Sequence, residues 1–487
     1  MKHRARLFRP PPQGVPSAPW HVSPGVDIIA YAFSWLLVLA PIALVGDDMR
    51  VEFLWAYLLT MCVTDAHRHY SLPYIYLDSQ VFRRHTLRFV LFPIALFALF
   101  IASPWAARGQ FVSVSGMLAV FAGFAFLLQI LGTDSEQERP SIAHLANVVA
   151  PVLGGVGLIN LVWPSLDLYG RGLVWLAATL IASLTFEVAR RRRCAEAGGR
   201  PRVVLPLAIA ALLGTAAYFP DLQMSAKSGL NAAAVIAAVW GIWHVFMQKY
   251  GILRLYNAKS GRERKVPGWV DRLLIWSWLP LYLAYLGPRY QGFLFQKFRR
   301  GKEILTPIVE AIEVVQEFLL VPSIALVIVA LALFLVHERR ANGLRNAPRL
   351  WMGAGLTLLG ASFLLVHPFK AYIAYTFSHA VEYMVFVWAF QRRRYSEPLA
   401  HKPAITRFLR YPLFIYVGTV IICSVALLYF KYSGTGRYLF REMQRPEIFD
   451  IGTYEWLRYW VVYQSFMHFY YDGFLWKMRL PSVRASI

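Results

Sequence analysis

The stretch from Met467 to Lys477, MHFYYDGFLWK, closes the last long apolar segment of the chain. His468 and Asp472 lie four residues apart in it, so in a helix both side chains are on the same face. An ionisable residue inside a membrane costs about 2.5–3.5 kcal/mol on insertion scales and marks a functional site by default. The stretch therefore predicts a helix that presents an imidazole and a carboxylate to the interior of a membrane-embedded bundle.

The composition around this stretch indicates an integral membrane protein. Of the 487 residues, 57% are hydrophobic and only 16% are charged, which is too apolar for an ordinary soluble protein. Apolar runs of about 18–25 residues recur from Asp27 to Trp476, which favours membrane-spanning helices over barrel strands. The sequence predicts an all-α polytopic bundle of about fourteen transmembrane helices, with about twelve as the lower limit. Residues 1–26 form a basic, proline-rich tail, residues 27–477 a single transmembrane domain, and residues 478–487 a second tail.

The distribution of charge predicts the orientation. The net charge of +23 falls in short clusters between apolar runs, which is typical of topology signals rather than of a nucleic-acid interface. By the positive-inside rule these clusters and both tails are cytoplasmic, in the cytoplasmic (inner) membrane. The tail before Asp27 has no apolar core, so no cleavable signal peptide is expected. The sequence leaves open the topology of residues 287–318 and the oligomeric state. The main clusters are Arg190–Arg193, Arg254–Lys265, Arg339–Arg349 and Arg392–Arg394.

Three other apolar segments carry polar pairs at helical spacing, like the one at the end of the chain. The pairs are Asp65 with His69, His244 with Gln248, and His379 with Glu382. In the predicted topology all four segments run in the same direction. His244, His379 and His468 precede the basic residue at the inner end of their segments by 9 to 13 residues, which is about 14–20 Å of helix. We therefore expect the histidines to meet at one level of the bundle.

Several imidazoles at one level predict a metal site, because neutral imidazole is a common ligand of zinc, copper and iron and helical bundles build such sites from facing helices. The predicted ligands are His69, His244, His379 and His468, with His67 and Asp65 as possible additions. Asp472 and Glu382 are expected to bind the metal or to orient a ligand, and Gln248 to donate to a carboxylate or to substrate. Arg254 and Lys477, at the inner boundary, are candidates for holding a substrate headgroup.

This site favours oxidation of a membrane lipid or isoprenoid by non-haem iron and dioxygen. Such a reaction needs an oxidant that side chains alone cannot supply. A separate electron-donor protein is expected, because the sequence contains no flavin, nicotinamide or iron–sulfur motif. The HxxxH and HxxHH boxes of membrane desaturases are also absent. Zinc is the alternative cofactor and would indicate a hydrolase.

Two other classes of function remain open from the sequence. A metal-free lipid acyltransferase would use His379 as a general base, but it would leave His244 and His468 without a role. A proton-coupled transporter would use the intramembrane His, Asp and Glu residues as a relay. Against a transporter, the sequence shows no internal repeat and no matching pair of interrupted helices.

Overall fold

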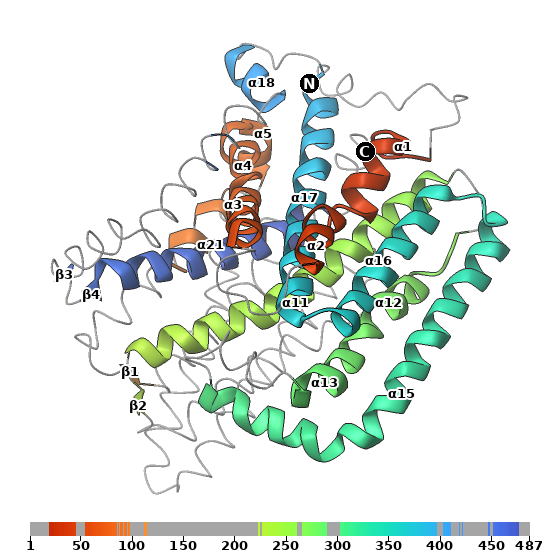
Figure 1. The fold of residues 1–487 in the computed structure, drawn as a ribbon. Coiled ribbons are helices and arrows are strands. Elements are labelled where there is room, and N and C mark those ends of the chain that lie inside the picture. The colour runs from red at the N-terminus through yellow and green to blue at the C-terminus, as the bar shows by residue number, and fades with distance from the viewer. Residues whose placement is uncertain are drawn as a thin grey trace, which may run out of the picture. The chain divides into compact units, whose positions relative to one another are not determined.

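The computed structural model is built almost entirely of helices in the part of the chain that it describes (Figure 1). It describes residues 19–44, 54–84, 86, 88–90, 92–94, 96–97, 112–113, 223–224, 226–260, 265–289, 302–396, 403–410, 418, 421, 447–448 and 451–476. Over these residues the predicted all-α class is confirmed.

The longer helices overlap predicted apolar segments, whereas the short helices α4, α5 and α18 lie outside them. Their bounds are α1 (Pro24–Asp27), the π-helical turn η1 (Ile28–Ala32), α2 (Leu36–Ala43), α3 (Leu54–His69), α4 (Leu72–Leu77), α5 (Ser79–Arg84), α11 (Ala226–Lys259), α12 (Gly268–Trp276), α13 (Trp278–Arg289), α15 (Lys302–Asn342), α16 (Ala347–Leu365), α17 (Pro368–Arg394), α18 (Pro403–Arg410) and α21 (Thr453–Leu475). The strands are β1 (Val112–Ser113), β2 (Gln223–Met224), β3 (Glu447–Ile448) and β4 (Ile451–Gly452).

The chain divides into two compact units, and the expected single transmembrane domain over residues 27–477 stays a prediction. The first contains residues 1–82, 234–442 and 464–487, and the second contains residues 83–233 and 443–463. Within the second unit, β1 pairs antiparallel with β2, and β3 pairs antiparallel with β4. Every described candidate site residue belongs to the first unit.

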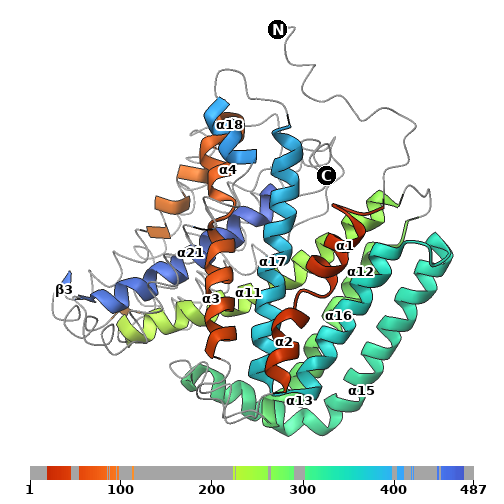
Figure 2. The same ribbon diagram turned by 45° about the horizontal axis from the view of Figure 1, so that its top comes forward.

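Helix α17 is the central element of the first unit. It contacts α2, α3, η1, α16 and α18, and both views show it running beside α3 (Figures 1 and 2). It begins at Pro368, in the first turn where proline is tolerated, and ends with Arg392, Arg393 and Arg394, which complement the helix dipole. Its buried face includes His379, so the same face that packs the core also carries the polar site residues.

A buried ion-pair network fixes the helices next to this centre. The Arg349 guanidinium, at the start of α16, lies 2.8 Å from Asp271 of α12 and 2.8 Å from Glu338 of α15. It also donates a 2.8 Å hydrogen bond to the Leu253 carbonyl of α11. Because all three charged side chains are buried and paired, the network links four helices at one point.

The predicted number of about fourteen membrane crossings is not confirmed. Within the described residues, one helix is long and apolar enough to cross a membrane, the part of α15 from Phe318 to Asn342, and the pair α1–η1 with α2, bent by 55°, could be a second. Helices α11, α17 and α21 cover predicted spans, but their polar and aromatic side chains lower their hydropathy. The predicted spans at 110–219 and 411–430 lie outside the described residues apart from isolated positions.

Two boundaries differ from those expected. The predicted span from Trp269 to Leu286 is divided at Ser277 into α12 and α13, and the Ser277 hydroxyl donates to the Leu274 carbonyl at 3.2 Å. Residues 304–318, in the connection where the sequence allows a separate amphipathic or re-entrant helix, instead form the first part of the continuous helix α15. Sequence periodicity shows that both segments are helical, but the end of a helix depends on local capping that apolar periodicity does not reveal.

Candidate metal centre

Four imidazoles from four helices converge in the interior of the first unit. They belong to His67 of α3, His244 of α11, His379 of α17 and His468 of α21, and all four are buried. The ring centroids of His67 lie 4.6 Å from His468 and 4.9 Å from His379. Those of His244 lie 4.8 Å from His468 and 5.1 Å from His379. The structure therefore brings together three of the four preferred histidines, and His67 supplies the fourth ring.

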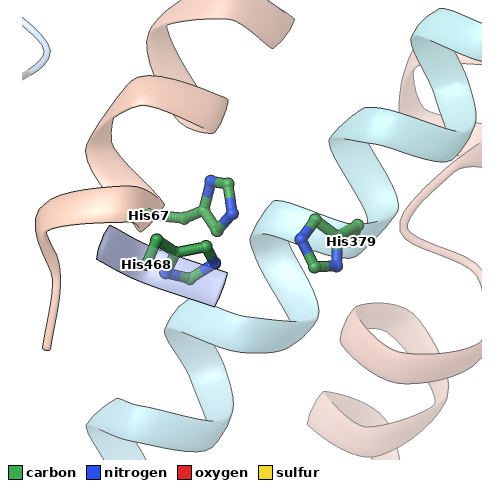
Figure 3. Close-up of side chains that lie close together, drawn as sticks. All are labelled: His67, His379 and His468. Atoms are coloured by element: carbon green, nitrogen blue, oxygen red, sulfur yellow. The ribbon is translucent and has the colours of Figure 1, made fainter. Parts of the chain in front are cut away.

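Three of these rings form the first group that could hold a metal ion. His67, His379 and His468 each offer one nitrogen, and these atoms lie within 4.8 Å of one another. Figure 3 shows the three rings close together, on three different helices. The His67 Nδ1 contacts the Thr64 carbonyl, which can only accept, so this nitrogen carries the proton. Its Nε2 then has a free lone pair and has no hydrogen-bond partner among the described residues.

The second such group contains Asp472 with His244 and His468. The Asp472 Oδ2 lies 3.5 Å from the His468 Nε2 and 3.7 Å from the His244 Nε2. Its other oxygen, Oδ1, accepts hydrogen bonds from the Tyr383 hydroxyl at 2.7 Å and from the Trp476 indole at 3.0 Å. These two donors fix the carboxylate so that Oδ2 faces the histidines. Asp472 thus faces both histidines, and nothing in the sequence indicates that Tyr383 and Trp476 orient it by hydrogen bonds.

His69 and Asp65 are not part of either group. His69 instead forms a hydrogen bond with Gln464, and the Asp65 carboxylate lies 3.7 Å from the Arg68 guanidinium. Residues two apart point about 200° away from each other around a helix, so His67 and His69 cannot both face the same cluster. The i,i+4 spacing places His69 and Asp65 on the same face of the helix. It does not show whether that face is directed toward the histidine cluster.

Glu382 and Gln248 support the cluster from the side. Glu382 is fully buried, pairs with Lys249, and accepts hydrogen bonds from Ser378 at 2.6 Å and from Gln248 at 3.3 Å. Gln248 also donates to the backbone carbonyl of His379 at 2.9 Å. Gln248 therefore donates to a carboxylate, as expected, and Glu382 is the counter-ion of a buried lysine. Sequence analysis missed Lys249, although a lysine within an apolar segment is itself a signal.

Of the two candidate headgroup residues, Arg254 belongs to the described part of the chain. The Arg254 guanidinium already donates to the Val266 carbonyl at 2.6 Å and to the Asp271 carboxylate at 3.2 Å. Arg254 therefore already has protein partners, and one of them, Asp271, also accepts from Arg349. Lys477 lies outside the described residues.

No protein-family model, curated protein or solved structure matches this chain. A function can therefore be inferred only from the chemistry of the site. The buried histidines and the aspartate could hold a metal ion, and this set of nitrogen and oxygen ligands is compatible with iron, zinc or copper.

Proposed function

We propose that this chain is a membrane-embedded metalloenzyme whose metal ion is bound by His67, His379 and His468. The observation that carries the proposal is the group of three buried nitrogens within 4.8 Å of one another. Nitrogens of all three rings have no hydrogen-bond partner in the described part of the chain. A buried polar atom without a hydrogen-bond partner lowers the stability of the folded protein by about 1–3 kcal/mol. A metal ion bound by all three nitrogens would remove this penalty.

The reaction that suits this site best is oxidation of a membrane lipid or isoprenoid, by hydroxylation or desaturation, at a non-haem iron. Imidazole ligands without a thiolate suit iron, and the bound iron would supply the oxidising power with dioxygen. Aromatic rings surround the cluster: Phe469 lies 4.8 Å from His244, and Tyr383 lies 5.0 Å from His468, between ring centroids. Such walls exclude water and accept an apolar chain. The electrons would come from a separate redox protein.

The surroundings of the cluster support the same proposal. Gln248 and the pair of Lys249 with Glu382 join α11 to α17, which carry two of the four histidines. Tyr383 of α17 and Trp476, the residue that follows α21, both donate hydrogen bonds to Asp472. These hydrogen bonds position the helices that carry the rings relative to one another, as an active site requires.

The membrane environment is part of the proposal. The apolar part of α15 supplies one helix able to cross a bilayer, and the composition of the whole chain favours further crossings. We propose a polytopic bundle of about fourteen helices in the cytoplasmic membrane, with both termini cytoplasmic. Ionisable residues inside such a bundle are expected to face its interior, as the four histidines do.

Elemental analysis of the detergent-purified protein tests the proposal. We expect iron in the wild-type protein and the loss of about one ion per chain in the variant His67→Ala/His379→Ala, because two of its three ligands are gone. The matched control is His337→Ala, since His337 packs edge-to-face against Trp269 and belongs to neither group of possible metal ligands. Circular dichroism and size-exclusion profiles like those of the wild type would show that the variants are folded.

The identity of the metal separates the reaction classes. Iron would direct substrate searches to lipids and isoprenoids with dioxygen, whereas zinc would replace the oxidation by a hydrolysis. A wild-type protein that binds no metal, even after anaerobic reconstitution with iron, would overturn the proposal. The metal-free acyltransferase with His379 as its base would then be the better interpretation.

A further inference from the structure

We propose that His244, His468 and Asp472 hold a second metal ion, so that His468 is shared between two ions. This inference rests on the proposed function, because it places the second ion beside the first. The two groups that could hold an ion have His468 as their one common member. His244 and Asp472 are not in the first group, so the five side chains outline two neighbouring sites.

The distances in the second group are those of ligands around an ion. The Asp472 Oδ2 lies 3.5 Å from the His468 Nε2 and 3.7 Å from the His244 Nε2, which is longer than a hydrogen bond of about 2.7–3.2 Å. Ligand atoms bound at about 2.0–2.2 Å in a tetrahedral arrangement lie roughly 3.3–3.6 Å from each other. The group is therefore too open for direct hydrogen bonds and close to the size that coordination requires.

His468 has the chemistry needed to serve both sites. Neither its Nδ1 nor its Nε2 has a hydrogen-bond partner among the described residues, although the ring is buried. Most metal-binding histidines donate their second nitrogen to a carboxylate or carbonyl acceptor. Here the Nε2 faces Asp472, and the other ring nitrogen has no such acceptor. With one ion on each side of its ring, His468 is an imidazolate. One nitrogen binds through the lone pair of the neutral ring, and the other binds after its N–H proton has been released to solvent, because metal binding requires deprotonated ligands.

Asp472 is prepared for the same role. Hydrogen bonds from Tyr383 and Trp476 occupy its Oδ1, and no hydrogen bond to its Oδ2 occurs within the described part of the chain. Second-layer donors of this kind orient a carboxylate ligand and reduce the entropy lost when it binds. Ions bound at these residues would supply Lewis-acid or redox chemistry toward dioxygen or a substrate oxygen.

Counting bound ions tests the second site. The purified protein would be stripped with a chelator and titrated anaerobically with Co²⁺, and the ions retained per chain would be measured by elemental analysis. We expect two ions in the wild type, one in His244→Ala, one in Asp472→Asn and one in His67→Ala. His468→Ala should weaken both sites. The matched control is Phe469→Leu, which changes a ring packed on His244 without removing a ligand and should retain two ions.

The possible results separate this inference from the proposed function. One ion in the wild type that is lost in His67→Ala and kept in both His244→Ala and Asp472→Asn would overturn the second site and leave the first intact. No ion in the wild type would overturn both. Two ions in the wild type, with one lost independently through each group and both sites weakened in His468→Ala, would establish the shared histidine.

Discussion

Lys249 and Glu382 show how single residues beside the cluster are constrained. Both side chains are buried, and their charges compensate each other. We predict that Lys249→Met lowers the free energy of unfolding by about 3–5 kcal/mol, because it leaves a buried carboxylate without its counter-ion. Denaturant unfolding in detergent, followed by circular dichroism, measures the change.

The double variant Lys249→Met/Glu382→Gln is the control for this prediction. It removes both charges and should recover most of the lost stability, since neutral groups carry a smaller desolvation penalty. Ser378 and Gln248 also donate hydrogen bonds to the Glu382 carboxylate. A Lys249→Met protein as stable as the wild type would show that these two hydrogen bonds alone are enough to stabilise the buried carboxylate.

At the scale of elements, the packing of α16 on η1 depends on a glycine. A Cβ atom on Gly355 would lie 2.2 Å from the Ala32 carbonyl oxygen, so one of the two backbones would have to move. We predict that Gly355→Ala lowers the free energy of unfolding by about 1–3 kcal/mol, as overpacking does.

Gly251 in α11 provides the matched control, since a Cβ there meets no atom within 4 Å. Gly251→Ala should raise the free energy of unfolding by up to about 1 kcal/mol, because alanine favours a helix more than glycine does. The same unfolding experiment measures both variants. If Gly355→Ala were as stable as the wild type or more stable, the contact between α16 and η1 would not be as close as described.

At the scale of the whole molecule, the membrane topology can be tested by cysteine labelling. In a variant without native cysteines, we predict that Ser260→Cys reacts with a membrane-impermeant thiol reagent only after the cells are opened. Ser260 belongs to the basic cluster predicted to be cytoplasmic. Leu365→Cys, at the exposed end of α16 and on the predicted outer side, should react in intact cells. Labelling of both, or of neither, in intact cells would contradict the predicted orientation.

The cores of several helices could be predicted from the sequence because they depend on local properties. The apolar segments at 230–253, 371–390 and 454–476 correspond to α11, α17 and α21, since long apolar runs without proline favour continuous helices. The break at Ser277 was missed, because a short interruption leaves the apolar pattern intact.

The convergence of His244, His379 and His468 could also be predicted. Ionisable side chains are unfavourable in lipid, so those within membrane helices face the interior of the bundle, where they can meet one another. Their shared depth followed from counting residues along helices of known rise. The choice between His67 and His69 could not be made in this way. Both lie in the last turn of α3, and the direction in which that turn faces depends on its contacts with α17.

The sequence by itself determined that this protein is helical, apolar and provided with histidines inside its helices, because composition and periodicity act locally. Only the tertiary structure decided which ring nitrogens meet, that Lys249 neutralises Glu382, and that Asp472 faces two histidines. The physical reason is that these contacts join segments up to about four hundred residues apart. Helical periodicity determines which side chains share a face of one helix. The packing of helices that are distant in sequence determines which of those faces is buried.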